Sequence, residues 1–344
     1  MSLLAIGAIA AGAAAILAWV AMALAVRLGF LDRPGTEAHK RQTRAVPYGG
    51  GFAVALAVVA GLLAAGAPVP EQWPLLAGAA VLLAIGAWDD RRALSARVKL
   101  GAQLIVATAA VLAGGDHLRI DSLHQLLPGA GHVAAILWLV AVTNAYNLID
   151  HADGISGTVG LISVGVLIAG CLLSGTPAAL AAAGLWAALA GGLVGFLLWN
   201  RPPARIYLGD AGSMPLGFLI GGGALTVTFW PQAEHAGSPL ALLAPLLVAA
   251  IPLFDSFVVV VKRWRRGRPI MKGDRNHISH RLGRLGLSPW AALLVIGALQ
   301  AALAAGAIQL RSATLADAIT TLVQALGVLV AVLLLETVRD DGDG

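Results

Sequence analysis

The sequence predicts an all-helical membrane protein with about eleven transmembrane helices. Composition is the first reason, because 58% of the 344 residues are hydrophobic, only 12% are charged and the mean hydropathy is +0.83. Soluble domains carry roughly a quarter charged residues, so this chain lies far outside that class. The second reason is the order of the chain, in which apolar runs long enough to cross a bilayer alternate with short polar loops.

A transmembrane helix needs about 20 mainly apolar residues, and eleven runs meet this criterion. They lie near 3–26, 47–66, 74–88, 98–114, 132–149, 158–174, 178–199, 212–229, 239–261, 289–310 and 317–337. The first run lacks the basic start of a signal peptide and is longer than its apolar core, so it counts as a span. No linker or internal repeat divides the sequence, which predicts one membrane-embedded domain over 1–344.

The basic residues predict the orientation of the chain. Apart from Arg119 and Arg311, every Lys and Arg follows the first, third, seventh or ninth run or lies in the C-terminal tail. The positive-inside rule then places the N-terminus outside and the C-terminus in the cytoplasm, and an odd number of spans agrees. Membrane topology therefore explains the net charge of +5 better than nucleic-acid binding does. The loops expected to form a cytoplasmic active site lie near 27–47, 89–98, 150–157, 200–211 and 262–288.

Acidic residues gather on the same predicted face. Ionisable groups at membrane depth are costly and usually mark a functional site, so we expect the chemistry on the cytoplasmic side. These residues are Asp89, Asp90, Asp150, Asp153, Asp210, Asp255 and Asp274.

Two adjacent aspartates, Asp89 and Asp90, end the third run. Adjacent carboxylates repel each other, and a divalent cation or a basic cluster relieves that repulsion. Such hard oxygen ligands suit Mg²⁺ holding a diphosphate, and a solvated helix end paired with its own arginines is the alternative. Lys99 either donates hydrogen bonds to a bound phosphate or is a snorkelling anchor at the start of the fourth run.

Four polar side chains recur at every third residue near the end of the fifth run, namely Asn144, Asn147, Asp150 and Asp153. On a helix each is rotated about 60° from the one before, and the set spans about 13 Å. They therefore form one polar stripe, which predicts a ligand site. Pairing with other helices is the alternative.

Two further motifs lie on the same face. Asp210 opens the eighth run, either as a helix N-cap or as part of a metal or phosphate site. The basic cluster 262–268 fits an anchor on anionic lipid. His277, His280 and Arg281 would present three donors near one helix face, suited to a pyrophosphate or lipid phosphate. Zinc is less well supported, because no Cys and no third nearby His completes a ligand set.

Together these motifs resemble the polyprenyl-phosphate N-acetylhexosamine-1-phosphate transferases, the relatives of WecA, TagO and MraY. The matching segments are His39-Lys40, Asp89-Asp90 with Lys99, the Asn-x-x-Asn-x-x-Asp-x-x-Asp-Gly stripe from Asn144 to Gly154, the Gly-Asp-x-Gly-Ser turn from Gly209 to Ser213, and the Asp-Arg-x-His-x-x-His-Arg loop from Asp274 to Arg281. The last loop is similar to that of the WecA-like branch. His151 and Ser279 depart from the family, which usually has Gly and His there, and both departures concern the identity of the sugar donor more than the reaction.

The resemblance implies a transferase that uses Mg²⁺, with Mn²⁺ as a substitute. It would move a sugar-1-phosphate, GlcNAc-1-phosphate first of all, from a UDP-sugar to a polyprenyl phosphate such as undecaprenyl phosphate, releasing UMP. The enzyme would lie in the cell membrane with its site on the cytoplasmic face. Its partners would be both substrates, the lipid bilayer and, as an option, a second copy of the chain, with no nucleic acid.

The resemblance also suggests roles for individual residues. Asp89 and Asp90 would place or deprotonate the acceptor, while Asp210, with Asn147 or Asp150, would hold the metal ion. The residues expected to bind the substrates are Asn144, Asp153, Lys99, Lys40, Arg275, His277, His280 and Arg281.

Other functions are less consistent with the sequence. Within the family, an MraY-type phospho-N-acetylmuramoyl-pentapeptide transferase is the main alternative, and the Asp274–Arg281 loop argues against it. A secondary transporter would show inverted repeats and polar residues near the middle of the membrane, whereas the carboxylates here gather at one face. A lipid-binding structural protein would not need four aspartates there. The clustered aspartate motif of CDP-alcohol phosphotransferases is absent.

Overall fold

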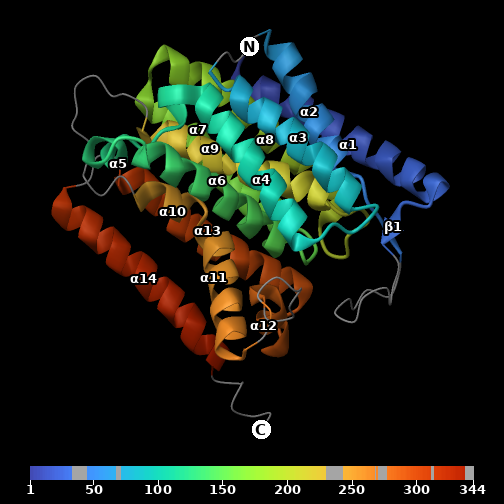
Figure 1. Cartoon of the computed structure of the whole chain (residues 1–344). Helices are drawn as coiled ribbons and strands as arrows, with labels where there is room; N and C mark the ends of the chain where they lie inside the picture. Colours follow the sequence, from blue (N-terminus) through green and yellow to red (C-terminus); the bar gives the residue numbers. More distant parts are fainter. Residues whose placement is uncertain are drawn as a thin grey trace.

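The computed structural model describes residues 1–32, 45–66, 71–229, 243–267, 269, 277–310 and 314–337. A helix overlaps each of the eleven predicted runs (Figure 1). These helices are α1 (Leu3–Leu28), α2 (Gly50–Ala65), α3 (Trp73–Asp89), α4 (Ala96–Gly114), α6 (Ala130–Ile149), α7 (Ile155–Ser174), α8 (Pro177–Asn200), α9 (Asp210–Phe229), α10 (Ala244–Val248) with α11 (Ala250–Arg265), α13 (Pro289–Leu310) and α14 (Leu315–Thr337).

Several short elements were not predicted. Strands β1 (Leu31–Asp32) and β2 (Val46–Pro47) form an antiparallel pair, and the 3₁₀ helix η1 (Gly115–Leu118) precedes helix α5 (Asp121–Leu126). Helix α12 (Ile278–Arg284) follows α11 in the described chain and contains His280 and Arg281, which the sequence had placed near one helix face. In Figure 1, α5 lies at one end of the helix bundle and β1 at the other.

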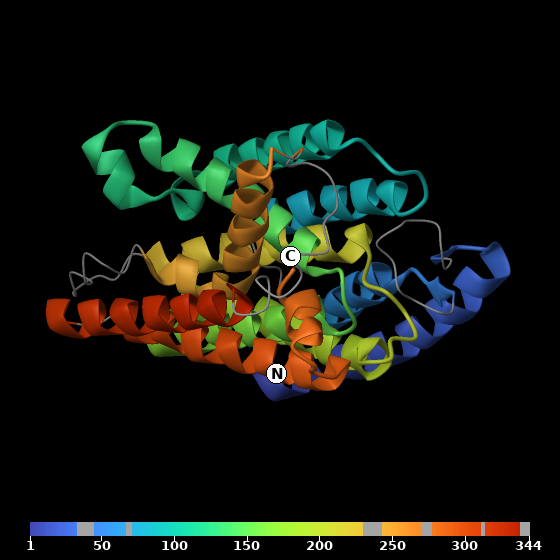
Figure 2. The same cartoon turned by 90° about the horizontal axis from the view of Figure 1, so that it is seen from below.

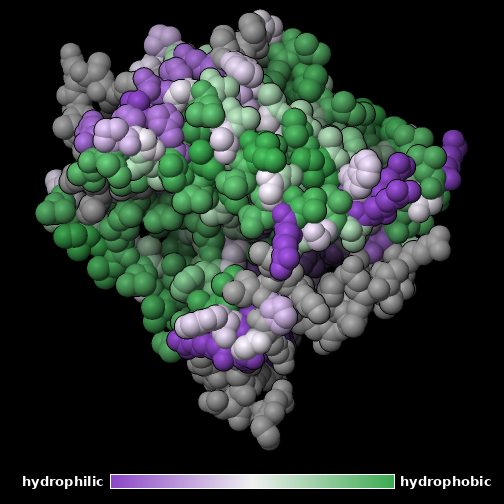
Figure 3. All heavy atoms as spheres, in the orientation of Figure 1, coloured by the Kyte–Doolittle hydropathy of each residue, from purple (hydrophilic) through white to green (hydrophobic). Residues whose placement is uncertain are grey.

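The protein is a multi-pass membrane protein. Among the described residues, seven helices are long and apolar enough to cross a bilayer, namely α1, α4 together with η1, α6, α7, α8, α13 and α14. Helices α2 and α3 are shorter apolar helices. Large apolar side chains cover the middle of the surface, while hydrophilic residues lie toward its ends (Figure 3). The count of eleven spans and the direction of the termini stay predictions.

Close packing between small residues holds the centre of the bundle together. Helix α8 packs against α1, α2 and α7. A Cβ atom on Gly191 would lie 2.0 Å from the carbonyl oxygen of Gly7, and one on Gly195 would lie 2.1 Å from that of Ala11. Such contacts let membrane helices approach backbone to backbone, where van der Waals packing replaces the hydrophobic effect.

The ninth predicted run is not one continuous helix, which corrects the sequence interpretation. The backbone breaks at Ala249, between α10 and α11. The amide of Gln300 compensates for the break, because its oxygen accepts from the N–H of Ile251 (3.0 Å) and its nitrogen donates to the carbonyl of Val248 (2.7 Å). A membrane helix tolerates a break only where neighbours bind the freed backbone groups in this way. Past the break, α11 crosses the other helices steeply (Figure 2).

Candidate active site

The two adjacent aspartates at the end of α3 have different partners. The Asp90 carboxylate accepts from the first two backbone N–H groups of α9, at 2.9 and 3.1 Å. The Asp89 carboxylate instead accepts from the backbone N–H of Leu94 (2.6 Å) and from Nζ of Lys99 (3.1 Å). Asp90 therefore caps α9 across the bundle. The sequence had offered Asp210 itself as that cap.

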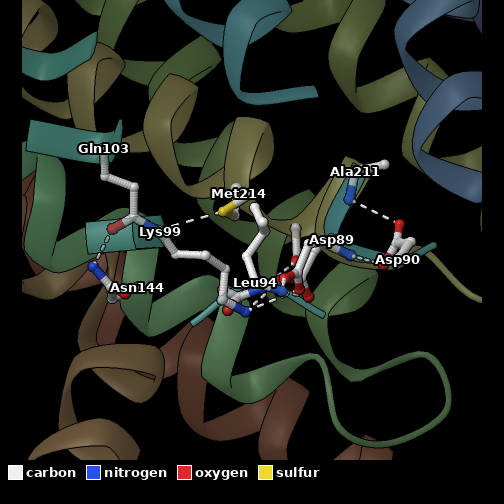
Figure 4. Close-up of polar contacts among 11 residues, drawn as sticks. Asp89, Asp90, Leu94, Lys99, Gln103, Asn144, Ala211 and Met214 are labelled. Carbon is white, nitrogen blue, oxygen red and sulfur yellow. Dashed lines mark hydrogen bonds and ion pairs between the residues drawn. The ribbon is translucent and has the colours of Figure 1, made fainter. Parts of the chain in front are cut away.

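Four predicted site residues converge around one ammonium group. Nζ of Lys99 lies 3.1 Å from Oδ2 of Asp89 and 2.8 Å from Oδ2 of Asp210. The amide of Asn147 donates to Oδ1 of Asp210 (2.8 Å) and to the hydroxyl of Ser213 (3.0 Å). Figure 4 shows Lys99 extending toward Asp89. These side chains come from α3, α4, α6 and α9, so a single cluster forms from segments far apart in the sequence.

Further carboxylates surround this cluster. Asp150, directly after α6, accepts a hydrogen bond from the backbone N–H of Gly209, and burial together with the charges of Asp210 and Asp90 raises the pKa of Asp150 well above its usual range. Burial and the charge of Asp210 likewise raise the pKa of Asp90 to about 7. Carboxylate oxygens are ligands that Mg²⁺ prefers. A divalent cation among these carboxylates would also relieve the repulsion between their negative charges. The residues therefore fit the predicted Mg²⁺ site.

Glycines let α2 and α3 approach the start of α9 at this cluster. A Cβ atom on Gly86 would lie 2.3 Å from the carbonyl oxygen of Asp210, and one on Gly51 would lie 2.5 Å from the backbone nitrogen of Gly212. Real Cβ atoms do not come this close, so larger residues would move α9. These backbone contacts fix the position of the first turn of α9 and therefore the position of Asp210 in the cluster.

The predicted polar stripe divides into two parts. Its two middle residues, Asn147 and Asp150, belong to the carboxylate cluster described above. Asn144 instead donates to the amide oxygen of Gln103 and to the carbonyl of Val140 (Figure 4). Asp153 accepts from the backbone N–H of Ala204 (2.8 Å) and so ties the α6–α7 turn to the loop before α9. In this structure the outer members of the stripe therefore bind other parts of the protein.

Asp255 in α11 organises a second cluster. The side chain is fully buried and accepts from Nδ1 of His277 (2.7 Å), the backbone N–H of Ile278 (2.7 Å) and a guanidinium nitrogen of Arg281 (3.0 Å). The sequence placed Asp255 on the active face but assigned it no role. A carboxylate within an apolar run was the available signal. His277 and Arg281 do lie together, as predicted, and both are buried around Asp255.

The two departures from the family pattern contact each other. The ring of His151 stacks on that of His277, with centroids 4.1 Å apart and planes 23° apart, and lies 5.2 Å from the ring of His280. Nδ1 of His151 is 2.9 Å from the carbonyl of Leu148, while Nε2 is hydrogen-bonded to the hydroxyl of Ser279. Burial and the neighbouring His277 ring lower the pKa of His151 to about 3, so its ring is neutral at pH 7.

His151 also bears on the zinc alternative. Together with Asp255 and His277 it offers three ligand atoms within 4.8 Å of one another, which supplies the third ligand that the sequence lacked. Both oxygens of Asp255 already accept hydrogen bonds, however, and Nε2 of His151 is engaged with Ser279. These ligand atoms therefore already have hydrogen-bond partners within the protein.

Two predicted substrate-binding residues, Lys40 and Arg275, and the loop residue Asp274 lie outside the described residues. A cavity of about 580 Å³ lies beside the loop before α9, lined in part by Trp199, Arg201, Arg205 and Trp290. It contains none of the predicted site residues. Indoles and arginines of this kind are typical of the membrane–water interface.

Comparison with known proteins identifies the family. Residues 72–228, which contain Asp89, Asp90, Lys99, the polar stripe and Asp210, match the model for glycosyl transferase family 4. The chain is 31% identical over 297 residues to a Bacillus subtilis protein named "probable undecaprenyl-phosphate N-acetylglucosaminyl 1-phosphate transferase", covering 85% of this chain and 80% of the relative.

Other relatives carry similar names. An undecaprenyl-phosphate alpha-N-acetylglucosaminyl 1-phosphate transferase of Yersinia pestis is 29% identical, covering 81% of this chain and 76% of its own. A decaprenyl-phosphate N-acetylglucosaminephosphotransferase of Mycolicibacterium smegmatis is 31% identical, covering 81% of this chain and 74% of its own. Identity at this level along most of both chains, with the matched segment centred on the carboxylate cluster, shows that the protein belongs to glycosyl transferase family 4.

Proposed function

We propose that this protein transfers GlcNAc-1-phosphate from UDP-GlcNAc to a polyprenyl phosphate, at the cytoplasmic face of the cell membrane. The observation that carries the proposal is the cluster in which Lys99 joins Asp89 to Asp210 and Asn147 completes the site. The names of the relatives support the same reaction. The basic loops around the cluster support a cytoplasmic location, with the N-terminus outside.

The chemistry is a phosphoryl transfer. An oxygen of the polyprenyl phosphate attacks the sugar-linked phosphorus of the UDP-sugar, a new P–O bond forms, and the P–O bond to the uridine-linked phosphate breaks with release of UMP. A phosphate monoester has a second pKa of about 6. At neutral pH the polyprenyl phosphate is therefore already mostly dianionic and needs no strong base. The protein must chiefly position two anions and neutralise their charge.

The geometry divides the work between the paired aspartates. Asp89 faces the cluster and shares Lys99 with Asp210, so it is the better placed of the two to meet the acceptor. Asp90 binds backbone N–H groups of α9 and holds Asp210 in position. Asp210, with Asn147 or Asp150, would hold Mg²⁺, which would neutralise the diphosphate and stabilise the leaving UMP.

The cationic groups would complete the substrate site. Lys99 already lies between two carboxylates and would contact a phosphate bound beside them. His277, His280 and Arg281 would face the donor from the α12 side. Lys40 and Arg275 would add positive charge, whose long-range attraction favours the binding of both anionic substrates.

The test is UMP release by purified protein in detergent with undecaprenyl phosphate, Mg²⁺ and UDP-GlcNAc, followed by other UDP-sugars. We expect UMP only when the lipid and the metal ion are both present. Asp210→Asn should lower kcat about 10²- to 10³-fold, the size of effect seen when one group stabilising transition-state charge is lost. The exposed Asp317 at the start of α14 offers a matched control, and Asp317→Asn should leave kcat unchanged.

Two results would count against the proposal. A folded protein that releases no UMP with any donor is not this transferase. Full activity in Asp210→Asn, with an unchanged melting temperature, would remove the metal assignment while leaving the reaction in place.

A further inference from the structure

The contact between His151 and Ser279 joins two segments that are far apart in the sequence. His151 lies in the turn between α6 and α7, next to Asp150, and Ser279 lies in the first turn of α12. The contact has a stacked part, His151 on His277, and a hydrogen-bonded part, Nε2 to the hydroxyl of Ser279. The imidazole therefore links the turn that carries Asp150 to the Asp255 cluster.

The direction of each hydrogen bond follows from the groups involved. The carbonyl of Leu148 can only accept, so Nδ1 of His151 carries the hydrogen. The neutral ring then has its lone pair on Nε2, and the hydroxyl of Ser279 donates to it. Because both nitrogens are engaged, the ring cannot rotate without losing two hydrogen bonds.

His277 is consequently held from two sides. Asp255 on α11 accepts from its Nδ1, and the ring of His151 covers one of its faces. The position of His277 relative to Asp150 thus depends on His151, which directly follows Asp150 in the chain. A donor whose diphosphate binds at Asp150 and Asp210 would lie beside this contact.

We propose that His151 and Ser279 are a pair of positioning residues for the UDP-sugar, which set the spacing between the Asp150 turn and the segment from His277 to Arg281. This inference rests on the proposed function and deepens it. The pair acts through His277 and the turn, so it governs how the donor is held. The polyprenyl phosphate, which enters from the bilayer, does not depend on it.

The test is a double-mutant cycle with His151→Ala, Ser279→Ala and the double variant. We would measure kcat and KM for UDP-GlcNAc at saturating undecaprenyl phosphate, and KM for the lipid at saturating donor. Each single variant should lower kcat/KM for the donor about tenfold, the effect expected from losing one part-buried hydrogen bond. The double variant should also lose about tenfold, because the second change removes a contact that is already gone. KM for the lipid should stay within about twofold of wild type.

Two variants separate positioning from stability. Ser279→Thr keeps the hydroxyl and should retain kcat/KM, whereas Ser279→Ala should not. His132→Ala, at the other end of α6, is the matched histidine control and should leave the kinetics unchanged. If His151→Ala fails to fold, His151→Phe replaces it, since its ring can still stack on His277 but has no nitrogen to accept from Ser279.

The outcomes are distinct. Single effects that multiply to about a hundredfold in the double variant, or an equal rise in KM for both substrates, would overturn the inference while the transferase activity stands. Wild-type kinetics in both single variants would overturn it as well. A wild-type protein that releases no UMP with any UDP-sugar would remove the proposed function, and this inference would fall with it.

Discussion

Replacing Asp255 with alanine should destabilise the protein more than any other single loss of a carboxylate described above. The side chain is 0% exposed, and its partners His277 and Arg281 are only 4% and 2% exposed. Breaking a buried ion pair by removing one partner costs about 3–5 kcal/mol, because the other charge stays buried. We therefore expect Asp255→Ala to lower the free energy of unfolding by about 3–5 kcal/mol. Asp255→Asn keeps one acceptor oxygen and should cost about 1.5–3 kcal/mol, the range for hydrogen bonds to charged groups.

The measurements are thermal unfolding in detergent, followed by tryptophan fluorescence, and hydrogen exchange at the backbone N–H of Ile278. The melting temperature should fall in the order wild type, Asn variant, Ala variant, and Ile278 should lose protection in the same order. Asp116 provides the matched control, since its carboxylate is mostly exposed and pairs with Arg119 at the other end of the bundle. Asp116→Ala should leave the melting temperature unchanged. If Asp255→Ala has the melting temperature of the wild type and the same hydrogen-exchange protection at Ile278, the reasoning from burial is wrong.

Two further substitutions test how the helices hold the site. Gly86→Ala places a Cβ atom 2.3 Å from the first carbonyl oxygen of α9 and should cost about 1–3 kcal/mol of stability together with most of the UMP release, whereas Gly101→Ala, with nothing within 4 Å, should be neutral or slightly stabilising. Gln300→Leu leaves the N–H of Ile251 without its acceptor and should cost about 1–3 kcal/mol in thermal unfolding. The exposed Gln125→Leu is its control, and equal melting temperatures for those two variants would show that Gln300 does not support the helix break.

Hydropathy predicted the helical membrane fold, and the polar motifs predicted residues that the structure brings together. Each predicted run contains a helix, and Lys99, Asp89, Asp210 and Asn147 meet as one cluster. The helices could be predicted because apolar runs of this length form membrane helices. The cluster could be predicted because carboxylates are costly to bury alone and therefore gather around common partners.

The rest depends on contacts that a linear pattern does not contain. Nothing in the sequence distinguishes Asp89, which faces Lys99, from Asp90, which caps α9, because adjacent residues at a helix end point in directions about 100° apart. The break at Ala249 was also missed. It is stabilised by Gln300, which lies in another helix about fifty positions away.

The histidine contact shows the same limit more sharply. His151 and Ser279 could each be recognised as unusual, yet their hydrogen bond joins residues 128 positions apart. Only the packing of α12 against the turn after α6 reveals that the two differences form one feature.

The backbone contacts of Gly51 and Gly86 have a consequence for how this enzyme could diversify. On that side of the site, α2 and α3 touch α9 through main-chain atoms, so a larger residue at Gly51 or Gly86 would shift whole helices. On the α12 side, the site is held by side-chain contacts from Asp255, His151 and Ser279. Under the proposed function, substitutions on the α12 side would therefore change donor preference while the contacts of α2, α3 and α9 keep the reaction geometry, and the two sides of the site would be free to evolve separately.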